Sequence, residues 1–222
     1  MKINLIILFF SISIAICYSQ ESAGTSSSVA TFDLELAAEL EVIFELDQNA
    51  RNERKKIIEK YGTKSKEMQA NNKNIRVWDS LNLIEIKNVL DSRGWLGTGV
   101  IREKGNLALF LVIQKADLST QLQYLPLMRE AVSSGKAENA ALALLEDRVA
   151  IRQGNGQIYG SQMKKDPETD TYYVLPLTEP DKVNDRRAKM GLEPIEEYLK
   201  NWNLIWDVEQ HKARIRGMKE NQ

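Results

Sequence analysis

Histidine and cysteine are nearly absent from this chain of 222 residues. It has one histidine, His211, and one cysteine, Cys17. A Ser-His-Asp or Cys-His site needs a positioned imidazole, and zinc sites in proteins are built from several Cys or His ligands. The composition therefore excludes an intrachain disulfide and a Cys-based or histidine-rich zinc site. Any proton transfer is left to carboxylates, Tyr, Lys or water, and we expect no metal and no cofactor.

Two further features are missing, an excess of positive charge and a long apolar run in the body of the chain. The formal net charge is −1 at pH 7. That balance does not favour a nucleic acid or an anionic membrane as partner. The apolar segment Leu107–Ile113 has only seven residues, whereas a membrane-spanning helix needs roughly 20. We expect no nucleic-acid partner and no transmembrane span.

The first residues have the layout of a secretory signal peptide. Lys2 supplies a positive charge, Ile3–Ile16 is almost wholly apolar, and a polar stretch follows. We expect cleavage after Ser19, so residues 1–19 are the signal peptide and the mature protein is extracytoplasmic, either periplasmic or secreted. An uncleaved anchor helix is one alternative, and a lipid on Cys17 is another. Bulky Ile16 argues against the lipid.

The rest of the chain divides by composition into a leader, a domain and a tail. Residues 20–30 are rich in Ser, Thr and Gly and are predicted to be a flexible leader. Residues 31–206 have the length and apolar content of a single helical domain. Residues 207–222 are predicted to be a charged, frayed tail.

Apolar periodicity predicts a mainly α fold with one small β-hairpin. Residues 64–73 are polar and are predicted to be a loop or a frayed helix end. Residues 106–114 fit a buried strand or a buried helix, and the flanking helices favour the helix. The hairpin pairs 157–163 with 171–177. The expected helices span about 31–61, 78–92, 106–114, 117–134, 137–152, 178–190 and 194–199, with Asp117 or Ser119 capping the fourth and Thr178 opening the sixth.

Several polar side chains fall where a helix should be apolar. Asp47 lies eleven residues after Leu36, which is close to three helical turns and places it on the apolar stripe. Gln114 follows Leu107 by seven residues, and Arg148 follows Ala141 by seven, which places both on the inward side of a helix. A buried charge costs several kcal/mol unless it is paired. The pattern therefore predicts either an internal salt-bridge network or a polar pocket between helices.

The chain resembles an uncharacterised group of bacterial domains of unknown function, over roughly Leu36 to Tyr198. The matching segments are Asp47-Gln48 with Arg51, Gly94-Trp95 with Gly99, Gln114-Lys115-Ala116-Asp117 with Gln121, Asp147-Arg148-Val149 through Gly154 to Gln157-Ile158-Tyr159-Gly160-Ser161-Gln162, and Arg187 with Gly191-Leu192 and Tyr198. The family pattern usually has His at the position of Lys115. The resemblance implies that these polar residues group together, and it implies no reaction.

We expect a binding domain for a polar small molecule or an envelope component. The set combines carboxylates that accept, guanidinium groups that donate, and amides that do both, which suits sugar hydroxyls, peptide groups or a small carboxylate. The candidate ligand-binding residues are Asp47, Gln48, Arg51, Gln114, Gln121, Arg148, Gln157, Tyr159 and Gln162.

Two other functional classes stay open. A carboxylate-dependent hydrolase acting on a cell-envelope glycan or peptide needs an acid pair across a cleft, and Asp117 with Asp147 are the candidate catalytic residues. A structural or assembly protein would have a filled interior and an exposed patch, for example around Trp202 and Trp206. A shared concave site that contains Asp47, Gln114, Arg148 and Gln157 distinguishes the binding domain.

Overall fold

The fold is known from a computed structural model that describes residues 31–166 and 168–220. In these residues the chain forms eight α-helices, one 3-10 turn and a two-stranded hairpin, which confirms the predicted mainly α fold. None of the described helices is long and apolar enough to cross a bilayer. The expected signal peptide and leader lie outside the described residues.

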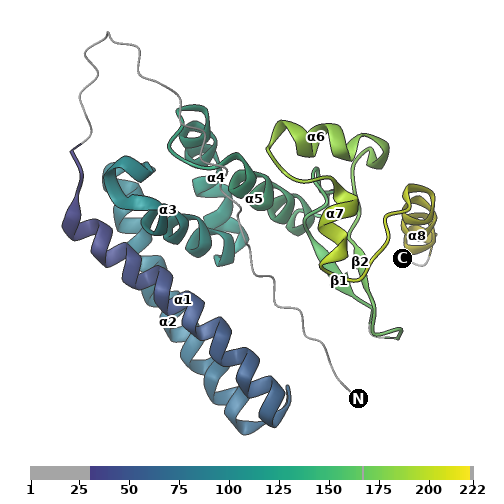
Figure 1. Cartoon of the computed structure of the whole chain (residues 1–222), viewed down its shortest axis with the longest axis horizontal. Helices are drawn as coiled ribbons and strands as arrows, with labels where there is room; N and C mark the ends of the chain where they lie inside the picture. Colours follow the sequence, from purple (N-terminus) through teal and green to yellow (C-terminus); the bar gives the residue numbers. More distant parts are fainter. Residues whose placement is uncertain (1–30, 167, 221–222) are drawn as a thin grey trace.

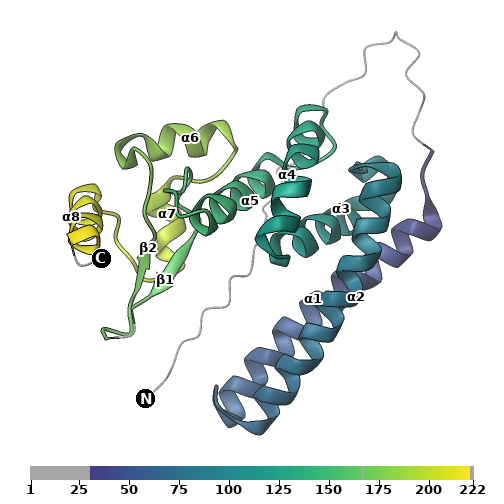
Figure 2. The same cartoon turned by 180° about the vertical axis from the view of Figure 1, so that it is seen from behind.

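Two long helices, α1 (Leu34–Tyr61) and α2 (Lys66–Arg93), run side by side (Figures 1 and 2). Asp33 caps α1 and Ser65 caps α2, because each side chain accepts a hydrogen bond from a backbone N–H of its first turn. The prediction that residues 64–73 form a loop or a frayed helix end is wrong, because α2 begins at Lys66, and so is the expected helix start at 78. The first half of α2 is polar and mostly exposed, so it carries no apolar stripe to reveal it.

Three more helices complete the N-terminal bundle, α3 (Thr98–Lys115), α4 (Leu118–Ser133) and α5 (Asn139–Arg152). The helix predicted over 106–114 is confirmed and begins earlier than expected. Asp117 caps α4, accepting a hydrogen bond from the backbone of its first turn at 2.7 Å. The five helices enclose a buried apolar core that includes Leu40, Ile86, Ile101, Leu109 and Leu145.

The C-terminal part has its own smaller core. It contains the hairpin of β1 (Met163–Lys165) and β2 (Tyr172–Val174), followed by α6 (Val183–Lys189) and α7 (Ile195–Lys200). Figures 1 and 2 place these elements at the end of α5, away from the tips of α1 and α2. The hairpin is confirmed, but its strands are shorter than predicted, and the first lies at 163–165, so that it shares only Met163 with the predicted 157–163. The buried members of this second core are Val174, Leu177, Val183, Ile195, Tyr198 and Leu199.

The last part of the chain departs from two predictions. Helix α8 (Val208–Glu220) occupies the stretch that was expected to be a frayed tail. His211 on this helix is buried against Trp206, with 5.2 Å between the ring centroids. Thr178 does not cap a helix: its hydroxyl donates to the carbonyl of Gly156 at 3.2 Å, and a 3-10 turn, Pro180–Lys182, precedes α6.

The two cores are joined by the carboxylate of Asp147, which lies on α5 and is 0% exposed. Its Oδ1 accepts hydrogen bonds from the backbone N–H groups of Ile158 and Tyr159 at 2.6 and 2.8 Å. Its Oδ2 accepts from the N–H of Ser161 at 2.8 Å. Three backbone N–H groups that donate to the two oxygens of one carboxylate make a strong contact. The segment 158–161 is therefore fastened to the end of α5.

The C-terminal core holds the other side of this segment. The Arg187 guanidinium donates to the carbonyl of Tyr159 at 2.7 Å, and the Tyr198 hydroxyl donates to the carbonyl of Ser161 at 3.0 Å. Gly160 has φ +75°, and a Cβ there would lie 2.7 Å from Cδ1 of Ile195. Both the backbone conformation and the lack of space require glycine. The segment 158–161 thus connects the two cores.

We predict that Asp147→Asn lowers the free energy of unfolding by about 3 kcal/mol. The amide has one acceptor oxygen, so at least one buried N–H loses its partner and faces another donor. Urea denaturation followed by circular dichroism measures the loss. Asp185→Asn is the matched control, because Asp185 is exposed and its side chain has no partner among the described residues. Equal stability of the two variants would contradict this role of Asp147.

Candidate functional site

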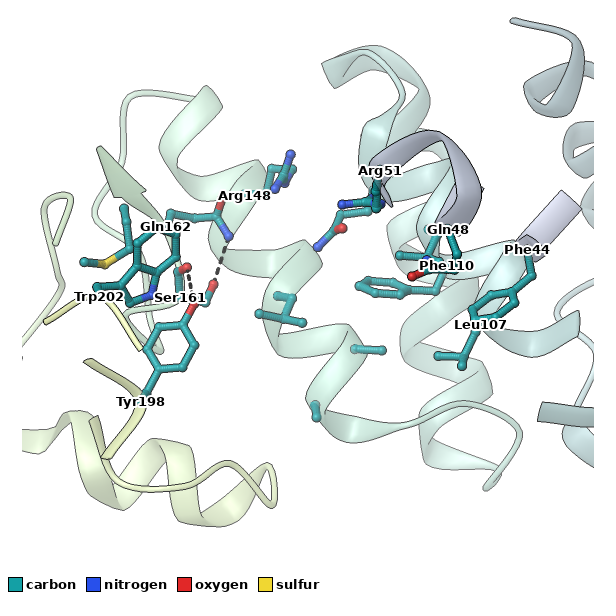
Figure 3. A pocket seen from close by; sticks show the side chains of 16 residues that line it. Phe44, Gln48, Arg51, Leu107, Phe110, Arg148, Ser161, Gln162, Tyr198 and Trp202 are labelled. Carbon is teal, nitrogen blue, oxygen red and sulfur yellow. Dashed lines mark hydrogen bonds between the residues drawn. The ribbon is translucent and has the colours of Figure 1, made fainter. Parts of the chain in front are cut away.

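A cavity of about 320 Å³ lies between the two cores, and we call it the inter-core cavity (Figure 3). Its walls come from α1, α3 and α5 on one side and from the 161–163 segment, α7 and Trp202 on the other. Its size is at the lower end of the range for small-molecule pockets. The lining residues are Phe44, Gln48, Arg51, Leu107, Phe110, Leu111, Gln114, Ala140, Ala141, Leu144, Arg148, Ser161, Gln162, Met163, Tyr198 and Trp202.

Arg148 is the one charged group in this wall that lacks a counter-charge among the described residues. Its Nε is buried without a hydrogen-bond partner, and no described residue accepts a bond from the guanidinium. Burial, with the nearby positive charges of Arg152 and Arg51, lowers the pKa of Arg148. An unpaired, partly desolvated guanidinium is costly. An anion that entered the cavity would remove part of that cost.

The neighbouring charges on α1, α2 and α3 form a network of ion pairs around Asp47. Its Oδ2 accepts from Arg51 Nε at 2.9 Å and from Gln48 at 3.2 Å. Its Oδ1 accepts from the Lys115 ammonium, which also donates to Asp79 at 2.8 Å. Burial raises the pKa of Asp47, but Lys115 and Arg51 outweigh it and hold the pKa below its usual value. Asp47 is therefore an internal ion-pair partner.

A second pocket, of about 280 Å³, adjoins this network between α1, α2 and α3. It is lined by Asp47, Asp79 and Lys115, and it shares Arg51, Gln114 and Arg148 with the inter-core cavity. The Gln114 amide makes no hydrogen bond to another described side chain or backbone group. Arg148 and Gln114 thus have free hydrogen-bonding capacity at the boundary of both pockets.

The structure brings most of the predicted binding residues together. Gln48, Arg51, Gln114, Arg148 and Gln162 line the inter-core cavity, and Asp47 lies in the adjoining pocket. Both arrangements that the sequence left open, a salt-bridge network and a pocket, are present. Arg51 belongs to both, because it bonds to Asp47 and lines the inter-core cavity.

Gln157 is separated from this group, contrary to the expected grouping. It is fully buried, and its amide donates to the carbonyls of Gln162 and Leu175 at 3.0 and 2.9 Å. Its side-chain oxygen accepts from the N–H of Gln162 at 2.7 Å. Gln157 lies outside the lining of both pockets, and its side chain joins the backbone at Gln162 to the backbone at Leu175, at the base of the hairpin.

Gln121 and Tyr159 also lie outside the lining of both pockets. The buried Gln121 donates to the carbonyl of Gln114 at 2.6 Å and so joins α4 to α3. The Tyr159 hydroxyl donates to Glu146 at 3.1 Å. Burial, with the charge of Glu146, raises the pKa of Tyr159 to about 12. Its hydroxyl therefore stays protonated at neutral pH.

The two candidate catalytic carboxylates do not face a common cleft. Asp117 is an exposed helix cap, and its bonds to Thr120 lower its pKa. Both oxygens of Asp147 are taken by backbone N–H groups. Burial raises the pKa of Asp147, although these bonds offset part of the effect. Neither carboxylate lines the inter-core cavity or the adjoining pocket.

The apolar lining of the cavity was not identified from the sequence. Phe44, Leu107 and Phe110 have the spacing of ordinary core residues, so no pattern separates them from the buried stripe. Trp202, named above as part of a possible exposed patch, packs against the C-terminal core and lines the cavity. Within 31–166 and 168–220, no three His, Cys, Asp or Glu residues are grouped as metal ligands.

We predict that the destabilisation caused by Asp47→Asn depends on pH. The pKa of Asp47 is lower in the folded protein than in the unfolded chain, so its stabilising effect is present above pH ~4 and is lost as the pH falls through the folded value. Urea unfolding at pH 7 and pH 3 measures the difference. Glu39→Gln, at an exposed position of the same helix, is the control. A destabilisation that is the same at both pH values would contradict the ion pairing.

Comparisons with known proteins identify the family and add no activity. No curated protein and no solved structure matches the chain. Residues 34–210 match the model of a family described as a family of unknown function, DUF6624. That range contains α1 to α7, both pockets and the segment 158–161, and it confirms the resemblance seen in the sequence. The chain therefore belongs to the family of unknown function DUF6624.

Proposed function

We propose that this domain binds a small organic anion in the inter-core cavity, with Arg148 as the group that receives the negative charge. The observation that carries the proposal is the unpaired guanidinium in the cavity wall. A guanidinium binds a carboxylate through two parallel hydrogen bonds, which are stronger than bonds between neutral groups. Binding would therefore supply the counter-charge that Arg148 lacks.

The other polar groups of the cavity support an acceptor-rich ligand. The Gln114 amide is free to donate beside Arg148. Arg51 uses its Nε for Asp47, which leaves its terminal nitrogens as further donors. None of the described residues that line the cavity is acidic. An anion entering this space meets donors and no negative charge.

The two alternative functions have less support. A hydrolase on carboxylates needs an open acid pair, and Asp117 and Asp147 are engaged in a helix cap and in backbone contacts. An assembly protein without a pocket is expected to have a filled interior, whereas a cavity of about 320 Å³ separates the two cores. The binding role is the one that the site geometry favours.

The proposal includes an extracytoplasmic location. It is supported by the apolar run Ile3–Ile16 after Lys2 and by the polar stretch that follows. The proposed ligand would then be a molecule of the periplasm or the medium, such as a free organic acid or an envelope component with a carboxylate.

We predict that the mature protein begins at Gln20. Expression of the full chain in a bacterial host, fractionation and intact-mass spectrometry measure the start of the exported protein. A lipid-sized mass addition on a chain beginning at Cys17 would support the lipid alternative. An intact chain that stays in the cytoplasm would contradict export.

We predict opposite effects of Arg148→Gln on binding and on stability. Loss of the charged bonds should weaken the binding of a carboxylate ligand by roughly tenfold to a hundredfold. Removal of a partly buried, unpaired charge should raise the stability of the free protein by about 1 kcal/mol. A thermal-shift screen of organic acids and neutral sugars, followed by calorimetry on the hits, measures both.

Arg54→Gln is the matched control, because Arg54 is an exposed arginine of α1 that bonds to Asn72 and lines only the adjoining pocket. It should bind acids as the parent does. Binding that is equal in Arg148→Gln and the parent, or stabilisation by neutral sugars alone, would contradict the proposed function.

A further inference from the structure

We infer that the ligand is an amphiphilic monocarboxylate, with its carboxylate on Arg148 and an apolar body that fills the rest of the inter-core cavity. The inference rests on the proposed anion binding and names the class of ligand. Its basis is the arrangement of charged and apolar groups around the cavity.

The charge of the cavity wall fits a single negative charge. Two cations, Arg51 and Arg148, line the cavity. Arg51 is already paired with Asp47 at 2.9 Å, whereas Arg148 has no partner among the described residues. One positive charge is therefore uncompensated. A monoanion neutralises it, while a dianion would bring one negative charge more than the uncompensated positive charge of the wall.

Most of the residues that line the cavity are apolar, and Gln48, Gln114, Ser161 and Gln162 are its uncharged polar ones. Figure 3 shows Phe44, Leu107 and Phe110 on one side of the space, Tyr198 and Trp202 on the other, and the two arginines along one edge. Ala140, Ala141 and Leu144 of α5 add further apolar surface. Sugar hydroxyls placed against these apolar side chains would lose hydrogen bonds to water without replacement. Methylene or aromatic groups gain free energy there instead.

The two ends of the cavity are built by different parts of the fold. Leu107 and Phe110 lie on α3, and Phe44 lies on α1, so one wall belongs to the N-terminal bundle. Tyr198 and Trp202 belong to the C-terminal core. A ligand that contacts both walls needs a body long enough to span them. A volume of about 320 Å³ holds on the order of ten water-sized groups, at roughly 30 Å³ each.

The test is a chain-length series measured by calorimetry on the domain. The ligands are acetate, butanoate, hexanoate and octanoate, with succinate, inorganic phosphate and glucose as polar comparisons. The affinity should rise by about fourfold for each added methylene until the cavity is full. Octanoate should therefore bind far more tightly than acetate, and the polar comparisons should bind weakly.

Two variants separate the apolar body from the carboxylate. Ala140→Leu fills part of the cavity and should weaken octanoate binding by tenfold or more, while acetate binding is unchanged. Leu107→Ala removes one apolar wall and should flatten the dependence on chain length. Val42→Ala is the control, because Val42 is an exposed aliphatic residue on α1 that lies outside the cavity.

The outcomes distinguish this inference from the proposed function. Binding of succinate or phosphate that depends on Arg148, with no effect of chain length, would overturn the amphiphilic ligand and keep the anion site. Binding of octanoate that is unchanged by Arg148→Gln would overturn both. So would the absence of binding by every anion in the series to the folded domain.

Discussion

The bonds from the Asp147 carboxylate to the backbone of residues 158–161 are the constraint on which the rest of the site depends. They fasten the C-terminal core to the end of α5, and Arg187 and Tyr198 hold the same segment from the other side. The two walls of the inter-core cavity belong to different cores, so this junction sets the distance between them. Because Arg148 follows Asp147 on the same helix, the junction also fixes where its guanidinium meets the cavity.

The adjacent residues Asp147 and Arg148 differ in their partners, because the carboxylate has hydrogen-bond donors and the guanidinium has no acceptor among the described residues. Asp147 has three backbone donors, whereas Arg148 has no acceptor among the described residues. Asp47 forms ion pairs with Arg51 and Lys115 near the cavity, and these two positive charges keep Asp47 ionised. The free protein therefore lacks the stabilisation that a counter-charge at Arg148 would provide. Such a trade of stability for binding is common at functional sites.

Local features of the fold were predictable from the sequence, and long-range partners were not. The Asp117 cap, the helix ends at Gly62 and Gly94 and the hairpin are encoded by residues next to each other. The polar start of α2 carried no periodic signal, so the helix was placed twelve residues too late. Helical spacing indicated that Asp47, Gln114 and Arg148 face inward, and they do meet at the adjoining pocket. Helical spacing could not show that Asp147 and Gln157 bond to backbone groups, because every residue has a backbone and the sequence does not indicate which one lies nearby.

The most direct measurement of the central claim follows the Nε–H resonance of Arg148 by nuclear magnetic resonance while hexanoate is added. Arg148→Gln assigns the signal by its disappearance. The account predicts a saturable shift of this resonance, since a carboxylate bonded to the terminal nitrogens of the guanidinium would change the charge beside the buried Nε–H. A resonance that stays unchanged while hexanoate perturbs groups elsewhere in the domain would contradict the account.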